Sequence, residues 1–170
     1  GTSPDKIRQI LGRLRDQVPG LTMRSTLIAG FPGETDAEFK ELCDFVEEFR
    51  FERLGVFRYS NEEGTPAYHH PDQVDERTKF ERQSELLRIQ GAIHREHNDR
   101  LLGQEMQVLV DGPSEQTELL LSGRTAGQAP EIDGTCYIND GWAEPGSIVT
   151  VQVEQVDDYD LVGGIVAPVP

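Results

Sequence analysis

The stretch that most constrains the fold is residues 24–39, where a strand, a glycine-rich turn and the start of a helix follow one another. Residues 26–29 are β-compatible and mostly apolar, as in a buried strand. Gly30 and Gly33 enclose a Phe-Pro pair, and this composition is typical of a sharp turn. Parallel α/β proteins bind ligands at such strand-to-helix corners, but a corner of this kind can also serve only to turn the chain.

The surrounding pattern predicts alternating helices and strands. Ser3 is expected to cap the first helix, and Thr35 with Glu38 forms a capping box before the second. The expected helices are 4–18, 36–50 and 75–102, the expected strands are 22–29 and 53–59, and a polar loop covers 60–74. Short connections between such elements indicate βαβ units with a parallel sheet.

After Gly103 the period of the apolar residues changes from that of a helix to that of a strand. Gly103 is therefore the expected C-cap of the long helix and the boundary between a domain of residues 1–103 and one of residues 104–170. Five short strands are expected in the second domain, over about 105–110, 119–122, 135–139, 148–153 and 158–166. Short strands separated by Gly and Pro predict a small antiparallel β-barrel of the OB-like kind.

Charge is unevenly placed along the chain. The net charge is −15, and residues 104–170 hold twelve acidic side chains against one basic side chain, Arg124. Such a surface repels phosphate backbones and attracts basic partners, although an acidic balance can also serve solubility alone.

The spacing of the cysteine and histidine residues does not predict a metal site. Cys43 and Cys136 are far apart and are expected to be reduced and packed as small apolar residues. His94 and His97 have a spacing that can pair metal ligands, but an exposed polar helix face is the favoured reading. No apolar run is long enough to cross a membrane, and no signal-peptide pattern is present. The reduced cysteines indicate a cytoplasmic location.

Alternation along the two strands suggests which side chains share a face. Arg24, Thr26 and Ile28 share one face of the first strand, and Gly55, Phe57 and Tyr59 share one face of the second. Arg24 either lies at an exposed strand start or faces a carboxylate or phosphate. The two aromatic side chains could accept a flat ring, but aromatic residues at strand spacing more often belong to a core.

The run Gly30-Phe-Pro-Gly-Glu-Thr35 resembles a motif of the radical S-adenosylmethionine methylthiotransferases, and further features follow in that family's order. They are Val56-Phe-Arg-Tyr-Ser60, Glu62-Glu-Gly-Thr-Pro-Ala67, the long helix with Asn98 and Leu101-Leu-Gly103, and a C-terminal barrel that looks like a TRAM domain. The resemblance implies a TIM-like barrel whose fifth and sixth strands are 22–29 and 53–59. It implies S-adenosylmethionine contacts from Arg24, Thr26, Ile28, Gly30, Gly33, Phe57 and Tyr59.

The resemblance extends to two branches of this family, which modify different substrates. One methylthiolates an adenosine of transfer RNA, and the other methylthiolates the β-carbon of an aspartate in small-subunit ribosomal protein twelve. Glu62-Glu63 stands where the transfer-RNA branch usually has a basic residue and proline, and Ala129-Pro-Glu-Ile-Asp-Gly134 looks like a signature of the protein-modifying branch. The acidic barrel also suits a basic protein better than RNA, so we expect a ribosomal protein substrate.

The family binds two 4Fe–4S clusters, one through a C-x-x-x-C-x-x-C motif and one through an N-terminal domain, and neither is found in this sequence. We therefore expect a C-terminal fragment without catalytic residues or metal ligands of its own. The alternatives left open are the transfer-RNA enzyme and a protein-interaction module without catalysis.

Overall fold

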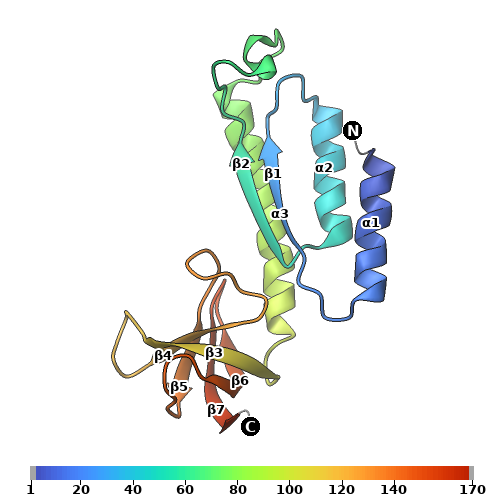
Figure 1. Ribbon diagram of the computed structural model, residues 1–170. Coiled ribbons are helices and arrows are strands. Elements are labelled where there is room, and N and C mark those ends of the chain that lie inside the picture. Colours follow the sequence, from blue (N-terminus) through green and yellow to red (C-terminus); the bar gives the residue numbers. More distant parts are fainter. Residues whose placement is uncertain (1–2, 169–170) are drawn as a thin grey trace. The chain divides into compact units, whose positions relative to one another are not determined.

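The computed structural model describes residues 3–168, which divide into two compact units between Ile93 and His94 (Figure 1). The first unit is mixed α/β and the second is a closed β-barrel. This confirms the predicted class of an α/β portion followed by a small barrel. The predicted domain boundary at Gly103 stays a prediction.

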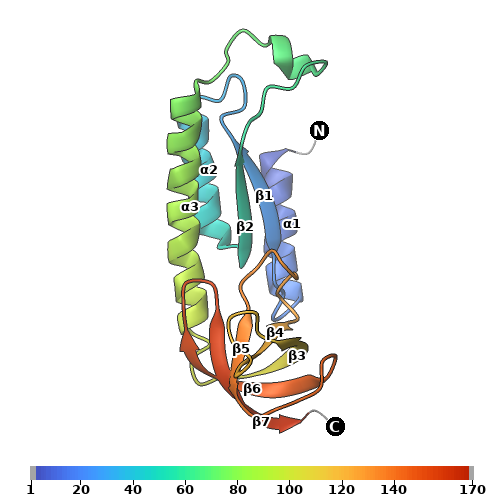
Figure 2. The same cartoon turned by 90° about the vertical axis from the view of Figure 1, so that its left-hand side faces the viewer.

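The first unit alternates helices with two parallel strands. Its elements are α1 (Pro4–Gln17), β1 (Arg24–Ala29), α2 (Asp36–Phe49), β2 (Arg53–Arg58), a 3-10 turn (Pro66–His69) and α3 (Glu76–Asp99), which continues into the second unit. β1 and β2 pair in parallel from Arg24 opposite Arg53 to Ala29 opposite Arg58. In Figure 2, α2 and α3 lie together along one side of this two-stranded ribbon.

Both predicted helix caps are present. The Lys6 N–H donates to Ser3 Oγ over 3.3 Å at the start of α1. At the start of α2, the Glu38 N–H donates to Thr35 Oγ1 over 3.2 Å, and Glu38 Oε2 accepts from the Thr35 N–H over 2.8 Å. These bonds satisfy amide groups that a helix start otherwise leaves unpaired.

One face of the β1–β2 ribbon is covered by helices. Side chains from β1, α2, β2 and α3 form the larger core cluster of the unit, and its buried members are Ala29, Val46, Val56, Leu86, Ile89 and Ile93. The apolar stripe of α1 is less buried than its helical period predicts, because Ile7, Ile10 and Leu14 are all exposed by 39% or more. The reason is an open groove beside this helix.

α3 ends at Asp99, so the prediction that it reaches residue 102 is wrong. The chain leaves the helix through turns in which the Leu101 N–H donates to the Asn98 carbonyl over 2.8 Å, and Gly103 has the left-handed φ of +74°. His94 lies in the last turns of α3 and is only 3% exposed, with its ring stacked on that of Tyr159 at 4.9 Å. The expected exposed histidine face is therefore also wrong at His94, because the loop after β6 covers it.

The second unit contains five strands in the closed order β3-β4-β5-β7-β6. They are β3 (Glu105–Pro113), β4 (Leu121–Thr125), β5 (Cys136–Asp140), β6 (Ile148–Val156) and β7 (Leu161–Pro168). Their inward side chains form the barrel core, namely Val108, Val110, Leu121, Cys136, Ile138, Val149, Val151, Val153 and Leu161.

The barrel is not entirely antiparallel, contrary to the prediction. β6 pairs with β3 to close the barrel, so β7 returns antiparallel to β6 and lies parallel to β5. The Asp-Gly-Pro run at 111–113 lies within β3, where the register shifts near Gly112. Among residues 3–168, no helix has the length and hydrophobicity needed to span a bilayer.

Candidate functional site

The side of the β1–β2 ribbon that faces away from the core is open. Ile28 and Phe57 are opposite each other in the parallel register and remain 53% and 61% exposed. Thr26 is opposite Gly55, and a Cβ atom at Gly55 would lie 3.6 Å from the Phe57 ring and 3.7 Å from Thr26 Oγ1. Because that atom is absent, a shallow apolar surface lies between Thr26, Ile28 and Phe57.

The glycine-rich turn lies directly after this surface, at the carboxyl end of β1. Gly30 is buried with a φ of +76°, and Gly33 has a φ of +86°. The Gly30 N–H donates to Glu34 Oε1 over 3.1 Å, and the Gly33 N–H donates to the Asp72 carbonyl over 2.8 Å. Both amide groups are used inside the chain, so these glycines shape the turn rather than offer hydrogen-bond donors to a ligand.

Two buried cationic side chains of α3 hold the turn in place. Arg82 donates to the Glu34 carbonyl over 3.0 Å, to Glu34 Oε1 over 2.8 Å and to Asp36 Oδ1 over 2.7 Å. The Lys79 chain passes so close to Gly30 that an added Cβ would lie 2.4 Å from Lys79 Cγ. Sequence reasoning missed both residues, and their only signal was a three-residue spacing that puts them on one side of a helix.

Tyr59 lies one residue beyond the end of β2. Its N–H donates to the Ala29 carbonyl over 2.9 Å, and its ring contacts the Phe31 ring edge-on at 5.2 Å. The ammonium group of Lys79 lies 5.3 Å from the centre of the Tyr59 ring. A polar pocket of about 380 Å³ adjoins it, lined by Phe57, Arg58, Tyr59, Ser60, Asn61, Glu76 and Gln83.

The predicted site residues thus form one group with one distant member. Ile28, Phe57 and Tyr59 gather at the carboxyl ends of β1 and β2, which is the end where parallel sheets bind ligands, and Gly30 and Gly33 shape the adjoining turn. Thr26 continues the same face. Arg24 lies on it as well but at the opposite end of β1, about 13 Å from Ile28 at the usual rise of a strand.

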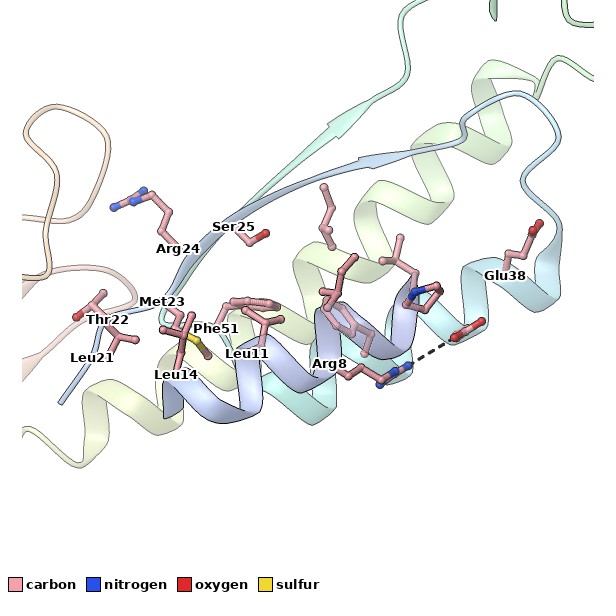
Figure 3. Close-up of a pocket in the computed structure, with 16 residues that line it drawn as sticks. Arg8, Leu11, Leu14, Leu21, Thr22, Met23, Arg24, Ser25, Glu38 and Phe51 are labelled. Atoms are coloured by element: carbon pink, nitrogen blue, oxygen red, sulfur yellow. Dashed lines mark ion pairs between the residues drawn. The ribbon is translucent and has the colours of Figure 1, made fainter. Parts of the chain in front are cut away.

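A second hollow of about 740 Å³ lies between α1, β1 and α2. Its walls are mostly apolar and include Leu11, Leu14, Met23 and Phe51, as Figure 3 shows. Figure 3 also shows Arg24 pointing away from Leu11 and Leu14. Within residues 3–168, β1 pairs only with β2, and Ser25 and Leu27 of β1 are among the residues that line this groove.

Both units are similar in sequence to known proteins. The TRAM domain family matches residues 102–166, which cover β3 to β6 and most of β7. The chain is 55% identical over 164 residues to "Ribosomal protein uS12 methylthiotransferase RimO" of Anaeromyxobacter sp. (strain K), a match that covers 96% of the chain. Proteins of the same name from Myxococcus xanthus (strain DK1622) and Geotalea uraniireducens (strain Rf4) are each 52% identical to it, over 98% and 97% of the chain.

Over nearly its whole length the chain is similar to proteins named RimO, which bears out the expected resemblance, and the expected TRAM domain is found. The chain spans about a third of the length of these relatives, 35% to 37%.

The two cysteines of the chain do not fit an iron–sulfur cluster. Cys43 lies on α2, and Cys136 is buried in the barrel core of the other unit. Burial raises the pKa of the Cys43 thiol, and it raises the pKa of Cys136 to about 11, so both favour the protonated form that does not bind metal. Residues 3–168 contain no group of three side chains suited to hold a metal ion.

Proposed function

We propose that this chain supplies one wall of the cofactor site and the substrate-recognition barrel of a radical S-adenosylmethionine methylthiotransferase. The proposed reaction adds a methylthio group to the β-carbon of an aspartate in ribosomal protein uS12. The observation that carries the proposal is the identity of 51% to 55% with proteins named uS12 methylthiotransferases over nearly the whole chain.

The open face of β1 and β2 suits the adenine of S-adenosylmethionine. Ile28 and Phe57 offer exposed apolar area to a flat ring, and Gly55 leaves room between the Phe57 ring and Thr26. Gly30 and Gly33 set the shape of the turn, while Tyr59 borders the site at the carboxyl end of β2. When bound, S-adenosylmethionine supplies radical chemistry and the methyl group, and these residues bind and orient it.

Arg24 and Thr26 face the same side as the adenine surface but lie toward the amino end of β1. A guanidinium group there can pair with a carboxylate, either that of the methionine portion or that of the substrate. The two 4Fe–4S clusters that the family implies need ligands from outside residues 3–168, because Cys43 and Cys136 do not fit them.

The groove beside α1 supports the proposal that β1 and β2 belong to a larger barrel. An unpaired edge of β1 next to an apolar groove of about 740 Å³ has the properties expected where a further parallel strand of a TIM-like barrel would lie. Filling the groove would also bury the apolar stripe of α1, which is the largest departure of this unit from its sequence pattern.

The charge of the barrel supports a protein substrate. Residues 104–170 hold twelve acidic side chains and one basic side chain, so the barrel attracts a basic protein and repels RNA. We propose a cytoplasmic location, where a ribosomal protein is available as the substrate.

The full-length protein, with its clusters restored, tests this proposal. We expect that incubation with S-adenosylmethionine, a reductant and ribosomal protein uS12 adds the mass of one methylthio group to a single aspartate. A matched reaction with transfer RNA should leave its adenosines unchanged. Modified transfer RNA together with unmodified uS12 would contradict the proposal and support the nucleic-acid branch of the family.

A further inference from the structure

One end of the barrel exposes two large apolar side chains that the barrel core does not use. Leu119, in the loop before β4, is 89% exposed, and Trp142, in the loop after β5, is 69% exposed. β4 and β5 are antiparallel, with Leu121 opposite Ile138. The residue before β4 and the residue after β5 therefore lie at the same end of the barrel.

The same two loops carry exposed carboxylates. Gln116 in the first loop donates to the Tyr137 hydroxyl over 2.8 Å, which links that loop to β5. Three exposed acidic residues lie in the two loops and a fourth is the last residue of β5; they are Glu115, Glu118, Glu144 and Asp140. The one basic residue of 104–170, Arg124, forms an ion pair with Asp111. No lysine or arginine of the barrel is left to neutralise the four carboxylates.

Scattered apolar residues are ordinary on a protein surface, but an exposed tryptophan at the same end of a barrel as a second large exposed apolar residue has the properties of an interface anchor. We propose that this end of the barrel docks a basic segment of a protein partner. In the docked state an apolar residue of the segment packs on Trp142 and Leu119, and its lysine and arginine side chains lie against the four carboxylates. An arginine can also pack on the face of the tryptophan ring. The inference rests on the proposed function and identifies the surface by which the barrel meets its substrate.

The other end of the barrel offers a matched comparison. Ile132 is 76% exposed there and lies between Glu131 and Asp133, so its local composition is similar. This end already makes contacts within its own unit. Tyr159 stacks on His94, and the Thr135 N–H donates to Asp160 Oδ1 over 2.7 Å. Ile132→Ala is therefore the control for removal of an exposed apolar side chain next to acidic residues.

Trp142 is the only tryptophan of the chain, so its fluorescence reports directly on the proposed surface. We expect a short lysine- and arginine-rich peptide with one central leucine to shift the emission to shorter wavelength, in a saturable titration that weakens as salt increases. The same peptide with glutamate in place of its basic residues should cause no shift. An unchanged emission with the basic peptide would overturn the inference.

Variants then locate the binding surface. With a labelled basic peptide and fluorescence anisotropy, Trp142→Ala should weaken binding at least about tenfold and Ile132→Ala by less than about twofold. Both side chains are exposed, so the unfolding midpoints should stay the same. Equal losses in the two variants, or a labelled single-stranded RNA that shifts the Trp142 emission to saturation, would overturn the inference.

The full-length protein separates this inference from the proposed function. If uS12 is methylthiolated equally well by the Trp142→Ala variant and peptide binding is unaffected, the docking surface is wrong and the function stands. If the basic peptide binds at Trp142 but uS12 is never modified, the docking surface stands and the function is wrong.

Discussion

Replacement of Gly30 by alanine tests how the turn is built. Gly30 has a φ of +76°, a conformation that costs an L-residue about 1–2 kcal/mol. The added Cβ would also lie 2.4 Å from Lys79 Cγ and 3.2 Å from Lys79 Cβ, within a buried part of α3. Overpacking of this kind costs about 1–3 kcal/mol. We therefore expect Gly30→Ala to lower the free energy of unfolding by about 2–5 kcal/mol.

Gly64 provides the control, because its φ is +84° and an added Cβ would have no neighbour within 4 Å. Gly64→Ala should cost only the conformational part, about 1–2 kcal/mol. Denaturant unfolding of the α/β unit, followed by circular dichroism at helix wavelengths, measures both variants.

A double-mutant cycle isolates the contact with Lys79. Lys79→Ala removes the Cγ atom that an alanine at position 30 would meet, so Gly30→Ala should cost about 1–3 kcal/mol less in that background. Equal losses for Gly30→Ala and Gly64→Ala, or no coupling with Lys79, would refute the close approach of α3 to the turn.

Three further predictions concern single side chains. Arg82→Met should destabilise the first unit by about 3 kcal/mol, because it leaves the mostly buried Glu34 carboxylate without its cationic partner, whereas Arg77→Met at an exposed ion pair should leave the unfolding midpoint nearly unchanged in the same assay. Cys136 should resist alkylation in the native state, since a pKa of about 11 leaves roughly a thousandth of the thiol ionised near pH 8, and mass spectrometry with and without denaturant checks this. Hydrogen bonds from the Thr78 hydroxyl and N–H hold the pKa of Asp75 below its usual value, so its stabilising effect is present above about pH 4 and is lost as the pH falls through the folded-state pKa. Asp75→Asn should therefore flatten the acid side of the stability curve, and an unchanged slope would contradict this.

Local patterns predicted the parts of the fold that depend on neighbouring residues. The capping box at Thr35 and Glu38 is a short-range device, and it formed where the sequence indicated. The period-two alternation grouped Thr26 with Ile28 and Gly55 with Phe57, and in the parallel register Thr26 is opposite Gly55 and Ile28 is opposite Phe57.

Features that depend on distant residues could not be predicted from such patterns. Arg82 reaches Glu34 across 48 residues, and nothing in the helical period of α3 identifies its partner. His94 has the sequence context of an exposed helix position, but the loop that contains Tyr159 covers it. The parallel pairing of β5 with β7 likewise follows from closure of the barrel, which no single strand encodes.

The affinity of the full-length protein for S-adenosylmethionine tests the central claim most directly. Phe57 and Phe80 belong to the same unit and are exposed by 61% and 58%, but only Phe57 lies on the open face of β1 and β2. Stacking of a base on an aromatic ring contributes about 1–3 kcal/mol, so Phe57→Ala should weaken binding by roughly 5- to 150-fold in equilibrium dialysis. Phe80→Ala should leave the affinity unchanged. An equal effect of the two substitutions, or no effect of either, would contradict the assignment of the open face as the cofactor wall.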